Sequence, residues 1–180
     1  MPNATELFEA EVSFAKGSDI TSLLDIKFES SGLMTIPCLT IERDTEILLR
    51  NLIAYEQQSS DVQLSKYFSH YIVFMDNLID SEKNVNLLRK KEIIVNLIGD
   101  DKNVASLFNT IGNGVTPYPD FYYNEEQAIE YSEKPWNRMK ANLKHNYFSN
   151  PWVGISIVAA IIYTPHTHNY TDYSSFHRFH

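Results

Sequence analysis

An uncharged apolar run occupies residues 152–163 (WVGISIVAAIIY) and restricts what the end of this chain can form. As a helix the run measures about 18 Å, whereas a bilayer core is about 30 Å thick and needs about 20 residues. Asn150 and Pro151 are typical of a helix start, and Pro165 would end the helix. The run is therefore too short to span a membrane comfortably, and it predicts a short helix that enters one leaflet or packs in a protein core.

The preceding residues 134–148 (KPWNRMKANLKHNYF) predict a basic amphipathic helix. Trp136, Met139, Leu143 and Tyr147 fall within roughly one fifth of the helical wheel. Cationic side chains occupy the other faces, with no acid among them. An ordinary surface helix fits this pattern. Next to the apolar run, however, the pattern favours an interfacial helix with its apolar edge in lipid and its cations on headgroups.

These two segments together form the predicted membrane-contacting site. Trp152 and Tyr163, at the two ends of the run, have the placement of interfacial aromatic residues. Positive charge before the run predicts a cytosolic body if the end inserts, without indicating which membrane. The predicted contact residues are Trp136, Met139, Lys140, Leu143, Lys144, Tyr147, Trp152, Ile155, Ile157, Val158, Ile161, Ile162 and Tyr163.

The distribution of charge supports a membrane partner and argues against nucleic acid. Through residue 133 the chain has 10 Lys+Arg against 22 Asp+Glu, whereas the remainder carries a net charge of +4. An acidic body repels phosphates over most of its surface, so no nucleic-acid partner is predicted. A short basic segment beside an apolar run suits an anionic membrane face.

The body of the chain predicts an α+β fold that is predominantly α-helical. Alternation around Ile26 and Phe28, a turn with Gly32 at positive φ, and resumption at Leu33 predict an antiparallel hairpin. We expect this small β unit near residues 10–41, then about five helices and a short C-terminal apolar helix. The strand after the turn should be an edge strand or end at Pro37.

Helical periodicity begins after Asp44. A first stripe joins Leu48, Leu49, Leu52 and Ile53. The clearest stripe belongs to a core helix and comprises Leu64, Tyr67, Phe68, Tyr71, Ile72, Met75, Leu78 and Ile79.

Later helix boundaries follow from caps and breakers. The pair at residues 80–81 starts a helix with Val85 and Leu88, and Gly99 marks a stop before a further short helix. From residue 124 a longer helical stretch is expected, interrupted at Pro135.

No motif in the chain specifies a reaction. There is no G-x-S-x-G, no Gly-rich phosphate loop and no H-E-x-x-H. The acidic pairs at residues 100–101 and 125–126 are most simply explained as helix starts. Metal affinity of the histidine-containing tail after Pro165 would be adventitious. We therefore predict no catalytic residue, no cofactor and no metal site.

Several blocks of the chain, taken in order, resemble a plant-specific family known as domain of unknown function 247. They are ATELFEAEVSFAKG, LLDIKFESSGLMTIPCLTI, TEILLRNLIAYEQ, YIVFMDNLI, KKEIIVNLIGDDKNVASLFNTI and NYFSNPWVGISIVAAII. The resemblance implies a mostly helical, uncharacterised plant protein with a transmembrane helix that begins at Asn150, Pro151 and Trp152. Some grass relatives are implicated in pollen–stigma self-incompatibility, which implies recognition or signalling. No catalytic residues are established for the family, so the resemblance implies none in this chain.

The resemblance covers only the C-terminal portion of family members. It implies a family body at residues 1–149 and a truncated anchor-like helix at residues 150–163. The tail at residues 164–180 has no periodicity, which predicts disorder. Family members continue apolar where this chain changes to TPHTHNYTDYSSFHRFH, which indicates an altered splice, a frameshift or a truncated gene copy (a truncated paralogue).

Three hypotheses about function remain open. The first is a membrane-associated, non-catalytic plant protein that acts through an unknown protein partner in recognition or signalling. The second is a soluble hydrolase or transferase, which a buried cleft holding a histidine beside an acid would favour. The third is a gene fragment without an independent role, which an exposed apolar patch larger than a few hundred Å² would favour.

Overall fold

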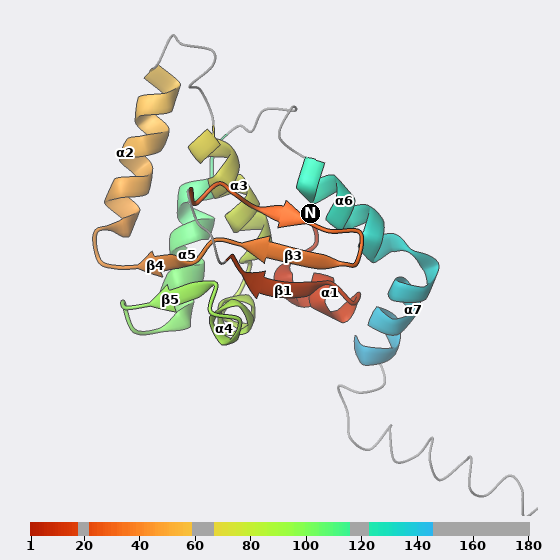
Figure 1. The fold of residues 1–180 in the computed structure, drawn as a ribbon. Coiled ribbons are helices and arrows are strands. Elements are labelled where there is room, and N and C mark those ends of the chain that lie inside the picture. The colour runs from red at the N-terminus through yellow and green to blue at the C-terminus, as the bar shows by residue number, and fades with distance from the viewer. Residues whose placement is uncertain (18–21, 59–66, 116–122, 146–180) are drawn as a thin grey trace, which may run out of the picture.

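The computed structural model describes residues 1–17, 22–58, 67–115 and 123–145 (Figure 1). Within these ranges the chain forms seven helices and five short strands, so the fold is α+β and mainly helical, as predicted. The helices are α1 (Ala4–Glu9), α2 (Thr45–Gln58), α3 (Tyr67–Leu78), α4 (Glu82–Lys90), α5 (Asp101–Gly112), α6 (Tyr123–Glu133) and α7 (Pro135–Leu143). The strands are β1 (Ser13–Lys16), β2 (Lys27–Phe28), β3 (Leu33–Ile36), β4 (Leu39–Ile41) and β5 (Ile94–Asn96).

The strands form two small sheets. In the first, β3 lies between β1, which runs parallel to it, and β2, which runs antiparallel. The predicted hairpin is therefore confirmed, and β3 ends at Ile36, just before Pro37. It is a central rather than an edge strand, because β1 pairs along its other side with Ser13 opposite Leu33.

The second sheet pairs β4 with β5 in parallel, and β5 was not predicted. From the sequence pattern we expected the helix that contains Val85 to end at Gly99, and this prediction was wrong. A positive φ of 57° at Glu92 turns the chain after α4, and Ile94 then pairs opposite Leu39. Short apolar runs suit a helix or a strand, and only the distant partner decides between them.

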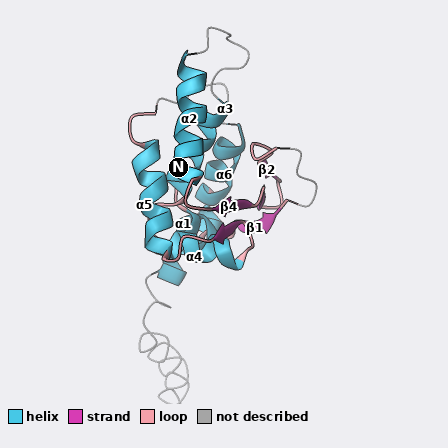
Figure 2. Cartoon of the chain, turned by 90° about the vertical axis from the view of Figure 1, so that its left-hand side faces the viewer, coloured by secondary structure: helices cyan, strands magenta, loops and turns pink. Residues whose placement is uncertain are grey.

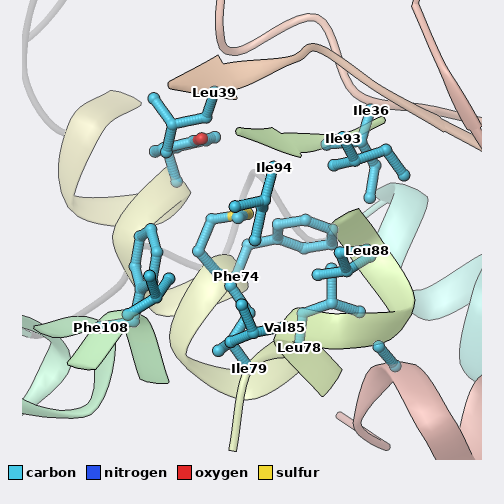
Figure 3. Close-up of a cluster of buried hydrophobic side chains, with 14 of the residues drawn as sticks. Ile36, Leu39, Phe74, Leu78, Ile79, Val85, Leu88, Ile93, Ile94 and Phe108 are labelled. Carbon is cyan, nitrogen blue, oxygen red and sulfur yellow. The ribbon is translucent and has the colours of Figure 1, made fainter. Parts of the chain in front are cut away.

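The hydrophobic core lies between these strands and helices α3, α4 and α5 (Figure 3). Strand side chains face helix side chains, and burying each large one contributes roughly 1.5–3 kcal/mol. The residues drawn from both sides include Ile36, Leu39, Ile94, Phe74, Leu88 and Phe108. Seen after a quarter turn, the strands form a small group beside the helices (Figure 2).

The predicted helical stripes are confirmed in part. Most of the α3 stripe is buried, although Tyr67 is 42% exposed and Leu64 lies outside the described residues. In α2, Leu49 and Ile53 are buried, but Leu48 is 58% exposed, so the stripe is narrower than predicted. The reason is that, within the described ranges, α2 packs mainly on α3 and α5, at one side of the fold (Figure 1).

Pro135 separates α6 from α7 as predicted, and it occupies the first turn of α7. Residues 134 and 135 thus allow α7 to take a direction of its own, towards α1. None of the helices in the described ranges has the length and apolar character to cross a bilayer. The apolar helix predicted at residues 150–163 and the tail at residues 164–180 lie outside those ranges.

Candidate functional site

Helix α7 presents the predicted apolar edge to solvent. Trp136, Met139 and Leu143 are 63%, 44% and 41% exposed. At 100° per helical residue, the three side chains leave the helix within about 60° of one another. We call this surface the α7 apolar edge.

A neighbouring flank of α7 is fixed to the body by polar contacts. Asn137 is buried, and its Nδ2 donates to the Tyr131 carbonyl at 2.9 Å. Lys144 Nζ donates to Glu11 Oε1 at 2.6 Å, and Lys140 Nζ lies 3.4 Å from Glu11 Oε2. These contacts set the rotation of α7 and turn its apolar edge away from the body.

Glu11 partly neutralises two cations of α7. The hydrogen bond from the Lys144 ammonium, with the charge of Lys140, holds the pKa of Glu11 below its ordinary value of 4.5. Both lysines stay partly exposed, at 44% and 37% of the side chain. The structure thus brings Lys140 and Lys144 beside the apolar edge, but pairs them with an acid that the sequence pattern did not reveal.

The remaining predicted contact residues fall outside the described ranges. They are Tyr147, Trp152, Ile155, Ile157, Val158, Ile161, Ile162 and Tyr163. Their part in a membrane site stays a prediction.

A second feature, which the sequence pattern did not indicate, is a cleft of about 550 Å³. Its walls come from residues 22–26 and from α3 and α6, and we call it the α3–α6 cleft. Leu24, Ile26 and Phe74 contribute apolar walls, whereas His70 and Glu125 contribute the polar part. This volume is in the usual range for small-molecule sites.

His70 and Glu125 meet in this cleft although they come from different helices. His70 Nε2 lies 3.2 Å from Glu125 Oε1, and their side chains are only 15% and 5% exposed. Glu125 Oε1 makes no well-formed hydrogen bond with the described part of the chain. Burial raises the pKa of the Glu125 carboxyl from 4.5 to about 7, against a smaller opposing effect of the N-terminal ammonium.

Two side-chain contacts hold the walls of the cleft in place. Asn124 Nδ2 donates to the Ile26 carbonyl at 2.8 Å, and Asn124 Oδ1 accepts from Phe28 N at 3.2 Å. The start of α6 is thereby fixed to β2, next to Glu125. This arrangement places the carboxyl within the fold rather than at its surface.

The start of α3 is fixed by a buried acid from α2. Glu56 is 4% exposed, and its two carboxylate oxygens accept from Phe68 N at 2.6 Å and Ser69 N at 2.8 Å. The Ser69 hydroxyl donates to the same group at 2.9 Å. A carboxylate that accepts free amides of a helix start is stabilising, and here it orients the turn that carries His70.

The sequence contains partial signals for this site. His70 stands on the apolar face of the core helix, among Tyr67, Tyr71 and Phe74 at three- and four-residue spacing. Glu125 does lie in the first turn of α6, so the helix-start prediction is confirmed. Its burial, and its meeting with His70, depend on how α6 packs and could not be read from spacing.

The chemistry available in the cleft is proton exchange and polar binding. A histidine beside a buried carboxyl that titrates near neutrality is a typical acid–base arrangement. Within the described ranges, no group of three His, Cys, Asp or Glu residues could hold a metal ion.

Comparison with known proteins places the chain among plant proteins without an assigned activity. Residues 1–164 match the family described as plant protein of unknown function, DUF247. The UPF0481 protein At3g02645 of Arabidopsis thaliana is 27% identical over 165 residues, which is 90% of this chain and 31% of the relative. The UPF0481 protein At3g47200 of the same plant is 31% identical over 144 residues, which is 78% of this chain and 30% of the relative.

The chain thus spans less than a third of the length of these two relatives. No solved structure shows a significant match.

Proposed function

The chain belongs to the DUF247 family of plant proteins of unknown function, and from this premise we propose that it is a membrane-associated, non-catalytic protein that acts through protein contacts in recognition or signalling. The observation that supports this proposal is the α7 apolar edge, formed by Trp136, Met139 and Leu143. The edge continues in sequence towards the uncharged run at residues 152–163.

The energy available from the edge is modest. A large apolar side chain gains roughly 1.5–3 kcal/mol on full burial, and these three are already about half covered. Each cation near an anionic surface adds about 1 kcal/mol. Because Glu11 compensates Lys140 and Lys144, the electrostatic part is smaller than the sequence indicates. The edge alone therefore gives weak, reversible binding, and the run at residues 152–163 supplies the rest.

Vesicle flotation tests this proposal with a matched pair of variants. The test variant replaces the edge, as Trp136→Ser, Met139→Ser and Leu143→Ser. The control replaces three apolar residues of α2 that are at least as exposed, as Ile47→Ser, Leu48→Ser and Tyr55→Ser. On phosphatidylcholine vesicles containing phosphatidylserine, the test variant should float several-fold less than the parent chain, and the control should float equally. Equal flotation of all three proteins would refute a role for the edge.

The contribution of the apolar run needs its own comparison. A chain ended at Ser149 lacks residues 150–163, and alkaline carbonate removes proteins held only at the surface. If the parent chain resists the wash and the shortened chain does not, the run inserts into lipid. If both are removed, the contact is limited to the surface.

A hydrolase or transferase is the second candidate function, because the α3–α6 cleft supplies the histidine beside a buried acid that this hypothesis required. The test is turnover of chromogenic esters and glycosides by the parent chain and by His70→Asn. His145→Asn, at an exposed position, is the matched control. Turnover that is lost only in His70→Asn would establish an enzyme and contradict the non-catalytic proposal.

A further inference from the structure

The described lining of the α3–α6 cleft contains acidic side chains but no Lys or Arg. The acidic residues are Asp25 and Glu125. Asp25 is offset by Lys27, whose Nζ lies 2.9 Å away, whereas Glu125 is buried. The described lining residues therefore offer an anionic ligand two carboxyl groups, one histidine and no Lys or Arg, which disfavours phosphates and carboxylates relative to cations.

Two buried oxygen atoms of the cleft residues make no hydrogen bond within the described part of the chain. They are Glu125 Oε1, from which His70 Nε2 lies 3.2 Å away without hydrogen-bond geometry, and the hydroxyl of Tyr71; the two residues are 4% and 2% exposed. Buried polar groups are nearly always satisfied, so such atoms in a cleft indicate a missing partner. A partner of Glu125 Oε1 must donate a hydrogen bond, because a carboxylate oxygen accepts.

The apolar walls define the rest of the ligand. On α3, Phe74 lies one helical turn after His70, and Tyr71 lies one turn after Tyr67. Leu24 and Ile26 line the cleft from the adjoining segment. Aromatic faces attract cations, and apolar walls bind a hydrocarbon body. A donor that is also cationic satisfies the acid and suits the aromatic side chains at once.

From these observations we propose that the α3–α6 cleft binds a small organic amine, with its ammonium group against Glu125 and its hydrocarbon part against Phe74 and Tyr71. This inference does not depend on the membrane proposal, because α7 contributes no residue to the cleft. An ammonium group supplies Glu125 Oε1 with a full positive charge and with a donor of good geometry, which His70 Nε2 at 3.2 Å does not provide.

Protonation of the site sets the expected pH dependence. The groups that face or reach Glu125 are His70, Asp25, Tyr67, Tyr71 and the N-terminal ammonium. Only the ionised carboxylate attracts an ammonium, and the pKa of Glu125 is about 7. Amine affinity should therefore rise as the pH increases from 6 to 8 and level off above that.

The experiment compares three ligands of equal size by NMR titration of the full chain. Phenethylamine carries the cation, 2-phenylethanol is its neutral counterpart and phenylacetate is its anionic counterpart. Phenethylamine should bind at least about tenfold more tightly than the alcohol at pH 8, and phenylacetate should not bind at millimolar concentration.

Variants link the preference to the named carboxyl. Glu125→Gln should abolish the preference for the amine over the alcohol while the alcohol still binds, which shows that the cleft remains folded. Glu126→Gln changes the exposed neighbouring acid and should keep the preference. Equal binding of amine and alcohol to the parent chain, a preference that survives in Glu125→Gln, or no binding of phenethylamine would each overturn the proposal.

Discussion

Lys144 Nζ lies 2.6 Å from Glu11 Oε1, although 133 residues separate the two in sequence. The ion pair joins the end of α7 to the turn that follows α1. Together with the Asn137 contact, it sets which face of α7 meets solvent. The exposure of Trp136, Met139 and Leu143 is therefore a consequence of tertiary contacts as well as of helical spacing.

Replacing Glu11 with Gln should loosen α7. Because the pKa of Glu11 is lowered by folding, its stabilising contribution is present above pH 4.5 and is lost as the pH falls through the lower pKa of the folded state. Partial exposure limits the effect to at most about 1 kcal/mol. Hydrogen exchange at pH 7 should show faster exchange in α7, whereas Glu130→Gln, at an exposed site on α6, should not. Unchanged exchange in α7 would mean that Asn137 alone holds the helix.

Replacing Gly32 with Ala should destabilise the hairpin and its contact with α6. Gly32 has φ of +86°, and an added Cβ would overlap the Tyr131 ring. Gly99→Ala is the matched control, because Gly99 has φ of +101° with nothing within 4 Å. The left-handed conformation costs about 1–2 kcal/mol in both variants, and the overlap adds to it only at Gly32. The free energy of unfolding measured in urea should therefore be lower for Gly32→Ala than for Gly99→Ala. Equal values would contradict the close contact.

With Glu56→Gln, the start of α3 should unfold more readily than in the parent chain. The amide group would place a donor where Phe68 N or Ser69 N now donates to a carboxylate oxygen. Leaving a buried donor unsatisfied costs about 1–3 kcal/mol. Glu46→Gln on the same helix removes an exposed pair with Arg50, worth about 0.3–0.5 kcal/mol. Thermal unfolding of both variants measures the difference, and similar losses would show that Glu56 does not cap α3.

Glu125 predicts a specific dependence of stability on pH. Its folded pKa of about 7 exceeds the ordinary 4.5, so the folded chain holds an extra proton between these values. Stability contributed by this group consequently falls as the pH rises from 4.5 to 7 and stays reduced above pH 7. Glu125→Gln should remove this slope and be more stable than the parent chain at pH 8 by about 1–3 kcal/mol.

The control for this titration is Glu126→Gln, which should keep the slope of the parent chain. Since His70 is in direct contact with Glu125, the comparison should be repeated in a His70→Asn background. A slope that persists in Glu125→Gln in both backgrounds would assign the pH dependence to another group.

Local patterns in the sequence predicted those elements that local chemistry decides. Gly32 indicated the turn of the hairpin, Pro135 the break between α6 and α7, and Val85 and Leu88 the buried face of α4. Strand β5 was missed because Ile94 becomes a strand residue only by pairing with Leu39. The periodicity of a segment indicates how that segment can fold, but it does not indicate which distant strand the segment will pair with.

The candidate sites divide in the same way. The apolar edge of α7 was predictable, because the spacing of Trp136, Met139 and Leu143 determines their common face. The pairing of Lys144 with Glu11, and of His70 with Glu125, joins elements far apart in the chain. Such contacts follow from packing, so sequence spacing predicted neither of them.

The most direct measurement of the central claim is the fluorescence of Trp136 in the presence of lipid. The chain has two tryptophans, so Trp152→Phe leaves Trp136 as the single reporter on the apolar edge. With phosphatidylserine-containing vesicles, its emission should shift to shorter wavelength, and brominated acyl chains should quench it. Emission that keeps its aqueous wavelength and escapes quenching, while the protein floats with the same vesicles, would contradict insertion of the α7 apolar edge.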